Sequence, residues 1–86
     1  MLIFAEGTIN RPVEGDKQAA ASAWLGPMVD AGFMQAGYHD AVNNRVLMVL
    51  SAETMNDVEL RLADLPVVRD GSVTFRASHV TALRFT

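Results

Sequence analysis

Apolar and polar residues recur along this chain with two periods, the two-residue period of a β-strand and the longer period of an α-helix. Four segments are strand-like. Apolar residues begin the first of these near the N-terminus, and Pro12 ends it because proline cannot donate a hydrogen bond to a sheet. The last segment is long enough to bend or to change partners partway. The expected strands are residues 2–8, Phe33–His39, Arg45–Leu50 and Ser72–Phe85.

Two segments between these strands have the longer period of an amphipathic helix. In the first, from about Lys17 to Ala31, apolar residues recur at spacings of four, four and three, at Ala20, Trp24, Met28 and Ala31. Asp16 is expected to cap its start and Gly32 to end it. Gly26-Pro27 interrupts the segment without breaking the phase of the apolar positions, which predicts a kink in one helix.

The second helical segment carries apolar residues at spacings of three, four and three, at Met55, Val58, Leu62 and Leu65. Ser51 or Thr54 is expected to cap it, and Leu65-Pro66 closes it because proline removes a helix hydrogen bond. A short apolar loop and the Asp70-Gly71 turn should then lead to the last strand.

The resulting order βαββαβ predicts an α+β fold of the ferredoxin-like, or split βαβ, type, with an antiparallel sheet and two helices on one face. The second and third strands are joined through residues 40–44, where two asparagines tolerate the positive φ of a hairpin turn. Residues 46–50 are apolar on both faces of the third strand, so the sheet is expected to be covered on both sides. A partner chain is the expected cover for the face without helices.

Composition agrees with a small domain that associates with itself. Residues 1–86 are expected to form one domain, and the chain is 50% hydrophobic but only 20% charged. That balance predicts apolar surface for a homodimer or a larger ring.

Net charge, hydropathy and cysteine content limit the kinds of partner and chemistry that we expect for this chain. A net charge of −3 with seven scattered basic residues argues against nucleic acid, and no apolar run is long enough for a membrane span. With no cysteine, thiolate chemistry and a disulfide framework are excluded. The N-terminal residues lack a signal-peptide pattern, so a cytoplasmic location is the default expectation.

Several functions that use this fold do not fit the residues. An RNA-recognition module needs aromatic side chains on the third strand, where Arg45–Leu50 has none. A copper chaperone needs paired cysteines. An acylphosphatase needs a phosphate-binding loop after the first strand, where residues 10–15 read Asn-Arg-Pro-Val-Glu-Gly.

From Leu60 to Phe75, where a helix ends in Leu-Pro and an apolar loop leads to a strand, the chain resembles the muconolactone isomerase family of dimeric α+β barrel proteins. The resemblance covers most of the chain in layout. It implies two chains packed sheet to sheet, a pocket between each sheet and its helices, and a proton shift in a small unsaturated lactone of aromatic catabolism without metal or organic cofactor. The first helix has fewer charged side chains than is usual in that family, so no catalytic residue is carried over.

Candidate acids and bases come from the chain itself. A proton shift needs a base, a donor for the developing enolate oxygen and exclusion of water. Strand alternation places His79 in an otherwise apolar row with Phe75, as a pocket base or as a histidine bonded to backbone. Tyr38 and His39 must point to opposite faces, and we expect Tyr38 to be the donor and His39 to face the hairpin. Glu6 is an alternative acid or base, or an exposed strand-end residue.

Other residues are candidates for binding substrate. Trp24 could wall a pocket between helix and sheet or pack in the core, and Phe75 shares the row of His79. Arg69 and Arg76 could hold a substrate carboxylate or be solvated. No metal site is expected, because the two histidines lack a local ligand spacing.

Three functions remain open on this evidence. The first is a cofactor-independent isomerase acting on a small unsaturated lactone or ring acid, with His79 as base. The second is a cofactor-independent monooxygenase or polyketide cyclase acting on an aromatic substrate. The third is a barrel that binds a metabolite or serves in assembly without catalysis.

Overall fold

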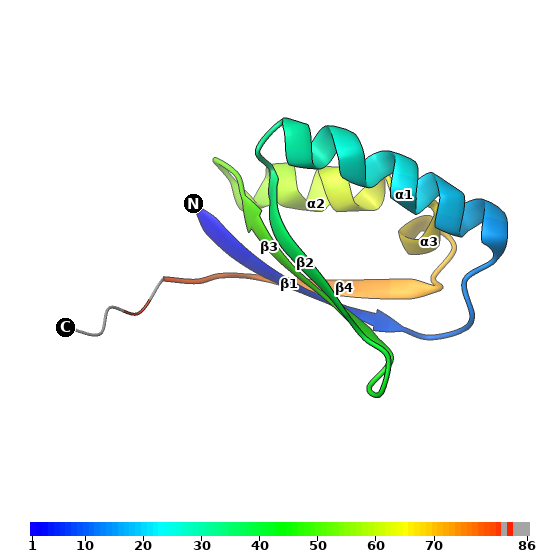
Figure 1. Ribbon diagram of the computed structural model, residues 1–86. Coiled ribbons are helices and arrows are strands. Elements are labelled where there is room, and N and C mark those ends of the chain that lie inside the picture. The colour runs from blue at the N-terminus through cyan, green and yellow to red at the C-terminus, as the bar shows by residue number, and fades with distance from the viewer. Residues whose placement is uncertain (82, 84–86) are drawn as a thin grey trace.

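The computed structural model describes residues 1–81 and 83, and these form a sheet with helices over one face (Figure 1). The order of elements confirms the predicted ferredoxin-like α+β fold. The elements are β1 (Leu2–Ile9), α1 (Gly15–Asp30), β2 (Met34–Asp40), β3 (Arg45–Ser51), α2 (Met55–Ala63), α3 (Pro66–Arg69) and β4 (Val73–His79).

The sheet has four antiparallel strands in the order β2-β3-β1-β4, so the first and third strands are central. Successive side chains alternate between its two faces, and cross-strand partners share a face. The face beneath the helices carries Ile3 and Ala5 from β1 and Met48 and Leu50 from β3, all buried. Val58 and Leu62 of α2 and Leu65 and Val67 beside it complete this core.

The opposite face of the sheet, which we call the outer face, has no helix over it (Figure 1). In the register of the strands, Phe4 of β1 pairs with Val49 of β3, and Glu6 pairs with Leu47. Phe4, Leu47 and Val49 are half-buried rather than buried. The apolar outer side of β3 that the sequence indicated is therefore present, and nothing within this chain covers it among the described residues.

Helix α1 lies farther from the sheet than α2 does. None of its residues is buried, whereas α2 buries two side chains. Trp24 connects it to the rest: its ring meets Phe33 edge to face at 6.2 Å between centroids, and its Nε1 donates to the carbonyl of Arg61 over 3.2 Å. The Arg61 guanidinium lies 4.9 Å from the centre of the Phe33 ring, which adds a cation–π contact.

Two details of the helices differ from the sequence predictions, and one of the two alternative caps of α2 is confirmed. Helix α1 begins at Gly15 with Glu14 at the cap position and no side-chain cap, so Asp16 lies inside the first turn. Thr54, not Ser51, caps α2 by accepting from the backbone N–H of Asp57 over 3.1 Å. The segment after Leu65 is the short helix α3 rather than a loop, because proline is well suited to the first turn of a helix.

The end of the chain also differs. Strand β4 ends at His79, six residues earlier than predicted, and Val80, Thr81 and Leu83 lie outside it. The rest of the predicted strand, residues 82 and 84–85, lies outside the described residues. Ala31, expected on the buried side of α1, is exposed at its C-cap.

Candidate functional site

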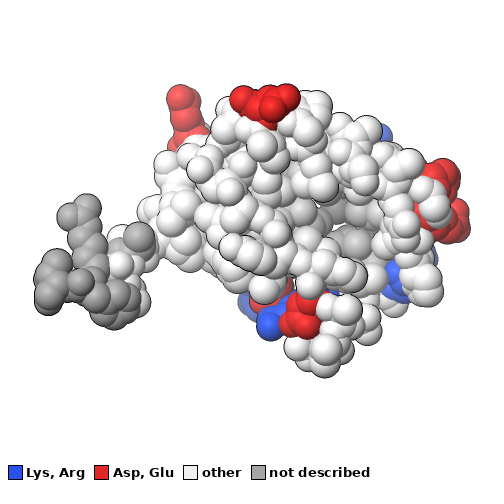
Figure 2. Space-filling view, viewed as in Figure 1, with Lys and Arg blue, Asp and Glu red and all other residues white. Residues whose placement is uncertain are grey.

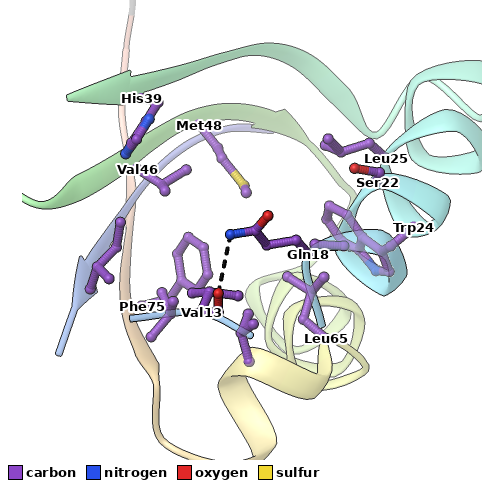
Figure 3. A pocket seen from close by; sticks show the side chains of 14 residues that line it. Val13, Gln18, Ser22, Trp24, Leu25, His39, Val46, Met48, Leu65 and Phe75 are labelled. Carbon is purple, nitrogen blue, oxygen red and sulfur yellow. Dashed lines mark hydrogen bonds between the residues drawn. The ribbon is translucent and has the colours of Figure 1, made fainter. Parts of the chain in front are cut away.

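A cavity of about 430 Å³ lies between α1 and the helix-facing side of the sheet. Figure 2 shows the surface hollowed below α1, and Figure 3 shows the side chains around this hollow. The volume falls within the range of small-molecule pockets, about 300–1,000 Å³. Fourteen residues line it: Ile9, Val13, Gln18, Ala21, Ser22, Trp24, Leu25, His39, Val46, Met48, Leu65, Val67, Val73 and Phe75.

The cavity exists because small side chains face the sheet where α1 crosses it. Ala21 and Ser22 line the cavity from α1 without filling it. At one end of the cavity, Trp24 of α1 and Leu65 form neighbouring parts of the wall (Figure 3). On the floor, the Phe75 ring lies over Gly7, whose missing side chain leaves room for it. A wide apolar space therefore remains above β1, β3 and β4.

Only three polar side chains line this space: Gln18, Ser22 and His39. Gln18 and Ser22 are four residues apart on α1 and so share one face of the helix. The Gln18 amide projects into the cavity, and its Nε2 donates to the carbonyl of Val13 over 3.1 Å (Figure 3). His39 lies across the cavity on β2, so the polar groups stand on two sides of an apolar pocket.

His39 points to the helix side because it pairs with Val46, which also lines the cavity. The β2–β3 hairpin next to it is fixed by Asp40, which accepts from Asn43 Nδ2 and from Arg45 Nε, each over 2.8 Å. The bond from Asn43, followed by that from Arg45, lowers the pKa of Asp40 to about 2. Asp40 is thus a hairpin residue, and its charge is already paired away from the cavity.

Outside the lining of the cavity, Asp70 connects α1 and the loop before it to the turn before β4. Its carboxylate accepts from Lys17 Nζ and, over 2.8 Å, from the backbone N–H of Ser72, and it lies 3.7 Å from Arg11 Nη2. The hydrogen bond from Lys17 is the largest cause that lowers the pKa of Asp70, and the same bond raises the pKa of Lys17. Lys17 and Arg11 are therefore both paired with one carboxylate.

The structure places the predicted acid and base candidates at different sites. His79 is in the helix-facing register, opposite Ile3, but it is exposed at the end of β4 and does not line the cavity. Tyr38 lies in the outer-face row opposite Leu47 and is 63% exposed. Glu6 is on the outer face as well, with Oε2 3.7 Å from Arg45 Nη1.

The expected orientation of Tyr38 and His39 was therefore wrong. A bulge in β2 between Met34 and Ala36 inserts one residue into the alternation. Counting from the buried Met34 would place Tyr38 on the helix side, but past the bulge that side belongs to Gly37 and His39. Local periodicity does not reveal a bulge, so the reversal was not visible in the sequence.

The candidates for binding substrate also separate. Trp24 and Phe75 both line the cavity. Arg76 pairs in register with Glu6 on the outer face, away from the cavity. Arg69 lies on the surface, where its Nη2 is 3.3 Å from Asp64 Oδ1 and its Nε donates to the carbonyl of Ala63. Neither arginine can reach a ligand in the cavity from these positions.

Sequence reasoning missed Gln18 and Ser22. Both stand in an alanine-rich part of α1, where they resemble ordinary solvent-facing positions. The available signal was their spacing of four residues on the side next to Trp24, which indicates a polar stripe beside an apolar one. Among the described residues there is no cluster of three or more metal-ligating side chains, and no helix there is long and apolar enough to span a membrane.

Comparison with known proteins supports the fold. No protein-family model matches the chain, and no curated protein sequence matches it. Among solved structures, it is similar to 5-chloro-2-hydroxyhydroquinone dehydrochlorinase from Burkholderia phenoliruptrix AC1100 in complex with 2,5-dihydroxybenzoquinone. The TM-score is 0.62 at 17% sequence identity, over 92% of this chain and 93% of that one. At this identity the similarity establishes the shared fold.

Proposed function

We propose that this protein is a cofactor-independent enzyme that transfers a proton on a small ring compound bound in the cavity, with His39 as the general base. The observation that carries the proposal is the lining of the cavity. Among its fourteen residues His39 is the one titratable side chain. Histidine is the side chain whose ordinary titration falls near neutral pH, which suits proton transfer in both directions.

The reaction that fits best is an isomerisation of a small unsaturated ring, such as a lactone. The imidazole of His39 removes a proton from an activated ring carbon, and the electron pair of that C–H bond moves into an enolate. The imidazolium exchanges its proton with solvent and then protonates the carbon two positions along, so that a double bond shifts and no oxidant or reductant is consumed. Ser22 can donate a hydrogen bond to the enolate oxygen.

The similar solved structure agrees with the substrate class. That protein is named as a dehydrochlorinase, and the ligand in its structure is a flat ring with oxygen substituents. A flat ring of this kind suits a cavity that has aromatic side chains, Trp24 and Phe75, on two sides. The proposal thus takes from this neighbour only the size and flatness of the substrate.

The test is proton NMR in heavy water with α-angelica lactone, a neutral unsaturated lactone, and with muconolactone, whose carboxylate should make it the poorer substrate because no lysine or arginine lines the cavity. We expect a shift of the double bond with uptake of deuterium at the transferred position. Replacing His39 by alanine should slow this reaction by about 10²- to 10⁴-fold, the usual contribution of a general base.

His79→Ala is the matched control, because it removes the other histidine, which lies outside the cavity. If His39 is the base, this variant keeps its rate. Loss of activity in His79→Ala but not in His39→Ala would assign the base to His79 instead. Absence of deuterium uptake with both lactones would contradict the proton-transfer function and favour a cavity that binds without catalysis.

We also propose that two copies of the chain associate through their outer faces. This face combines half-buried apolar residues of the two central strands with the exposed ring of Tyr38 at its edge. Opposite charges, Glu6 and Arg76, stand among them and can pair within the face. Burial of the apolar residues of the two central strands against a second copy would remove them from water and so stabilise the dimer.

A further inference from the structure

We propose that Gln18 makes the cavity selective for rings that carry an uncharged hydroxyl group, with Gln18 Oε1 accepting the hydroxyl hydrogen. The inference rests on the proposed function only in taking the cavity as the site of the ring substrate. It concerns which oxygen substituent that ring carries, and it assigns a role in specificity to a residue that does not transfer the proton.

The first argument is the orientation of the Gln18 amide. A glutamine side chain has two N–H donors on Nε2 and one acceptor oxygen. Here Nε2 donates to the carbonyl of Val13 over 3.1 Å, in the loop that precedes α1. That bond fixes which end of the amide faces the loop. The oxygen is therefore left to face the cavity, where Figure 3 shows it directed toward the space below Met48.

The second argument is the lack of a competing partner on this wall. Beyond Gln18, the parts of α1 that line the cavity are Ala21, Ser22, Trp24 and Leu25. The indole N–H of Trp24 is already bonded to the carbonyl of Arg61. The Ser22 hydroxyl, one turn along the same face, can both donate and accept. A ligand hydroxyl placed between Gln18 and Ser22 would have an acceptor and a hydroxyl partner, whereas a ligand without a hydrogen to donate would leave Gln18 Oε1 to water, because Gln18 is exposed.

The cavity also lacks a positively charged lysine or arginine that could pair with a ligand carboxylate. A carboxylate brought into an apolar pocket needs a cation, because its desolvation is otherwise very unfavourable. No lysine or arginine is among the residues that line this cavity. Lys17, next to Gln18 in α1, and Arg11, in the loop before α1, are both paired with Asp70. The cavity therefore disfavours ring acids and favours neutral rings, among which those with a hydroxyl group gain the bond to Gln18.

The experiment compares three ligands of nearly equal size by isothermal titration calorimetry: 2-naphthol, 2-methoxynaphthalene and 2-naphthoate. The intact protein should bind 2-naphthol about 3- to 10-fold more tightly than 2-methoxynaphthalene, the ratio expected for one neutral hydrogen bond. It should bind 2-naphthoate more weakly than either. Gln18→Met, which keeps length and removes the acceptor, should abolish the preference for 2-naphthol and leave the affinity for 2-methoxynaphthalene within about twofold.

Gln35→Met is the matched control, because Gln35 is exposed on β2 and does not line this cavity. It should keep the preference of the intact protein. Equal binding of 2-naphthol and 2-methoxynaphthalene by the intact protein would overturn this inference while leaving the proposed function in place. Tightest binding of 2-naphthoate would overturn it as well. Binding of none of the three would contradict both the inference and the ring-binding cavity on which it rests.

Discussion

Gly7 shapes the cavity through the side chain that it lacks. It pairs with Phe75 across β1 and β4, and a Cβ added at Gly7 would lie 2.8 Å from Phe75 Cε1 and 2.9 Å from Cζ. Those distances are shorter than any normal contact, so the ring can occupy its position only above a glycine. The floor of the cavity is thus determined by one residue that the sequence pattern would assign to an ordinary strand.

We predict that Gly7→Ala forces the Phe75 ring upward into the cavity. The strain should destabilise the fold by about 1–3 kcal/mol, as overpacking usually does, and should weaken the binding of 2-naphthol. Urea unfolding and calorimetry measure the two effects. Gly26→Ala is the control: nothing lies within 4 Å of the added Cβ, and alanine favours a helix, so stability should not fall. Unchanged ligand binding in a folded Gly7→Ala protein would contradict this account of the floor.

Between elements, the connection of α1 to the β4 side depends on polar contacts more than on apolar packing. Asn10 donates through Nδ2 to the carbonyl of Gly71 over 3.1 Å and to Thr74 Oγ1 over 2.9 Å. Arg11 Nε donates to the hydroxyl of the buried Ser72 over 3.1 Å. Together with the Lys17–Asp70 pair, these bonds tie the loop before α1 to the turn before β4. They hold the start of α1 in place although the helix buries no residue.

The charged pairs of this connection and of the β2–β3 hairpin predict how the free energy of unfolding changes with pH. The pKa of Asp70 is lowered, and that of Asp40 is lowered from 3.8 to about 2, so the folded chain binds fewer protons than the unfolded chain in acid. This contribution to stability is complete above the ordinary aspartate pKa of 3.8 and is lost as pH falls through the lowered values. The raised pKa of Lys17 acts in the opposite range: its contribution is complete below 10.5 and is lost as pH rises further.

We therefore predict that the urea midpoint of the intact protein falls when pH is lowered from about 4 to about 2. Asp70→Asn should be less stable at neutral pH and should show a smaller acid-dependent loss, because it removes one of the two groups responsible. Asp30→Asn, which changes an exposed aspartate at the end of α1, is the control and should keep the full loss. An equal acid-dependent loss in Asp70→Asn would show that the Lys17 pair does not connect these elements.

For the whole molecule, the question is what covers the outer face. We predict that the chain sediments as a dimer and that Val49→Lys shifts it toward monomer or aggregate, because Val49 lies on the outer face of a central strand beside Phe4. Analytical ultracentrifugation measures the result. Val42→Lys, at a hairpin position that is 91% exposed, is the matched control and should leave the dimer intact. Sedimentation of the unmodified chain as a monomer at all concentrations would contradict the proposed association.

The sequence alone determined the order and the type of the elements. Period-two and helical spacings persist for many residues, and they reflect which side of each element must leave water, so the ferredoxin-like order followed from them. The sequence also indicated Trp24 and Phe75 as candidates for lining a pocket, because large aromatic residues on the apolar side of an element tend to lie between layers. The short helix α3 was not predicted, because one turn is too short to show a period.

The cavity and the histidine that lines it were decided only by the tertiary structure. The bulge in β2 determined that His39, and not Tyr38, faces the helices. Strand β4 ends at His79, which is exposed and does not line the cavity. Gln18 and Ser22 line the cavity because of the position of α1, which Lys17 connects to Asp70 and Trp24 connects to Arg61. Spacing along a chain gives relative directions within one element. The distance between two elements depends on every side chain packed between them, which no local pattern records.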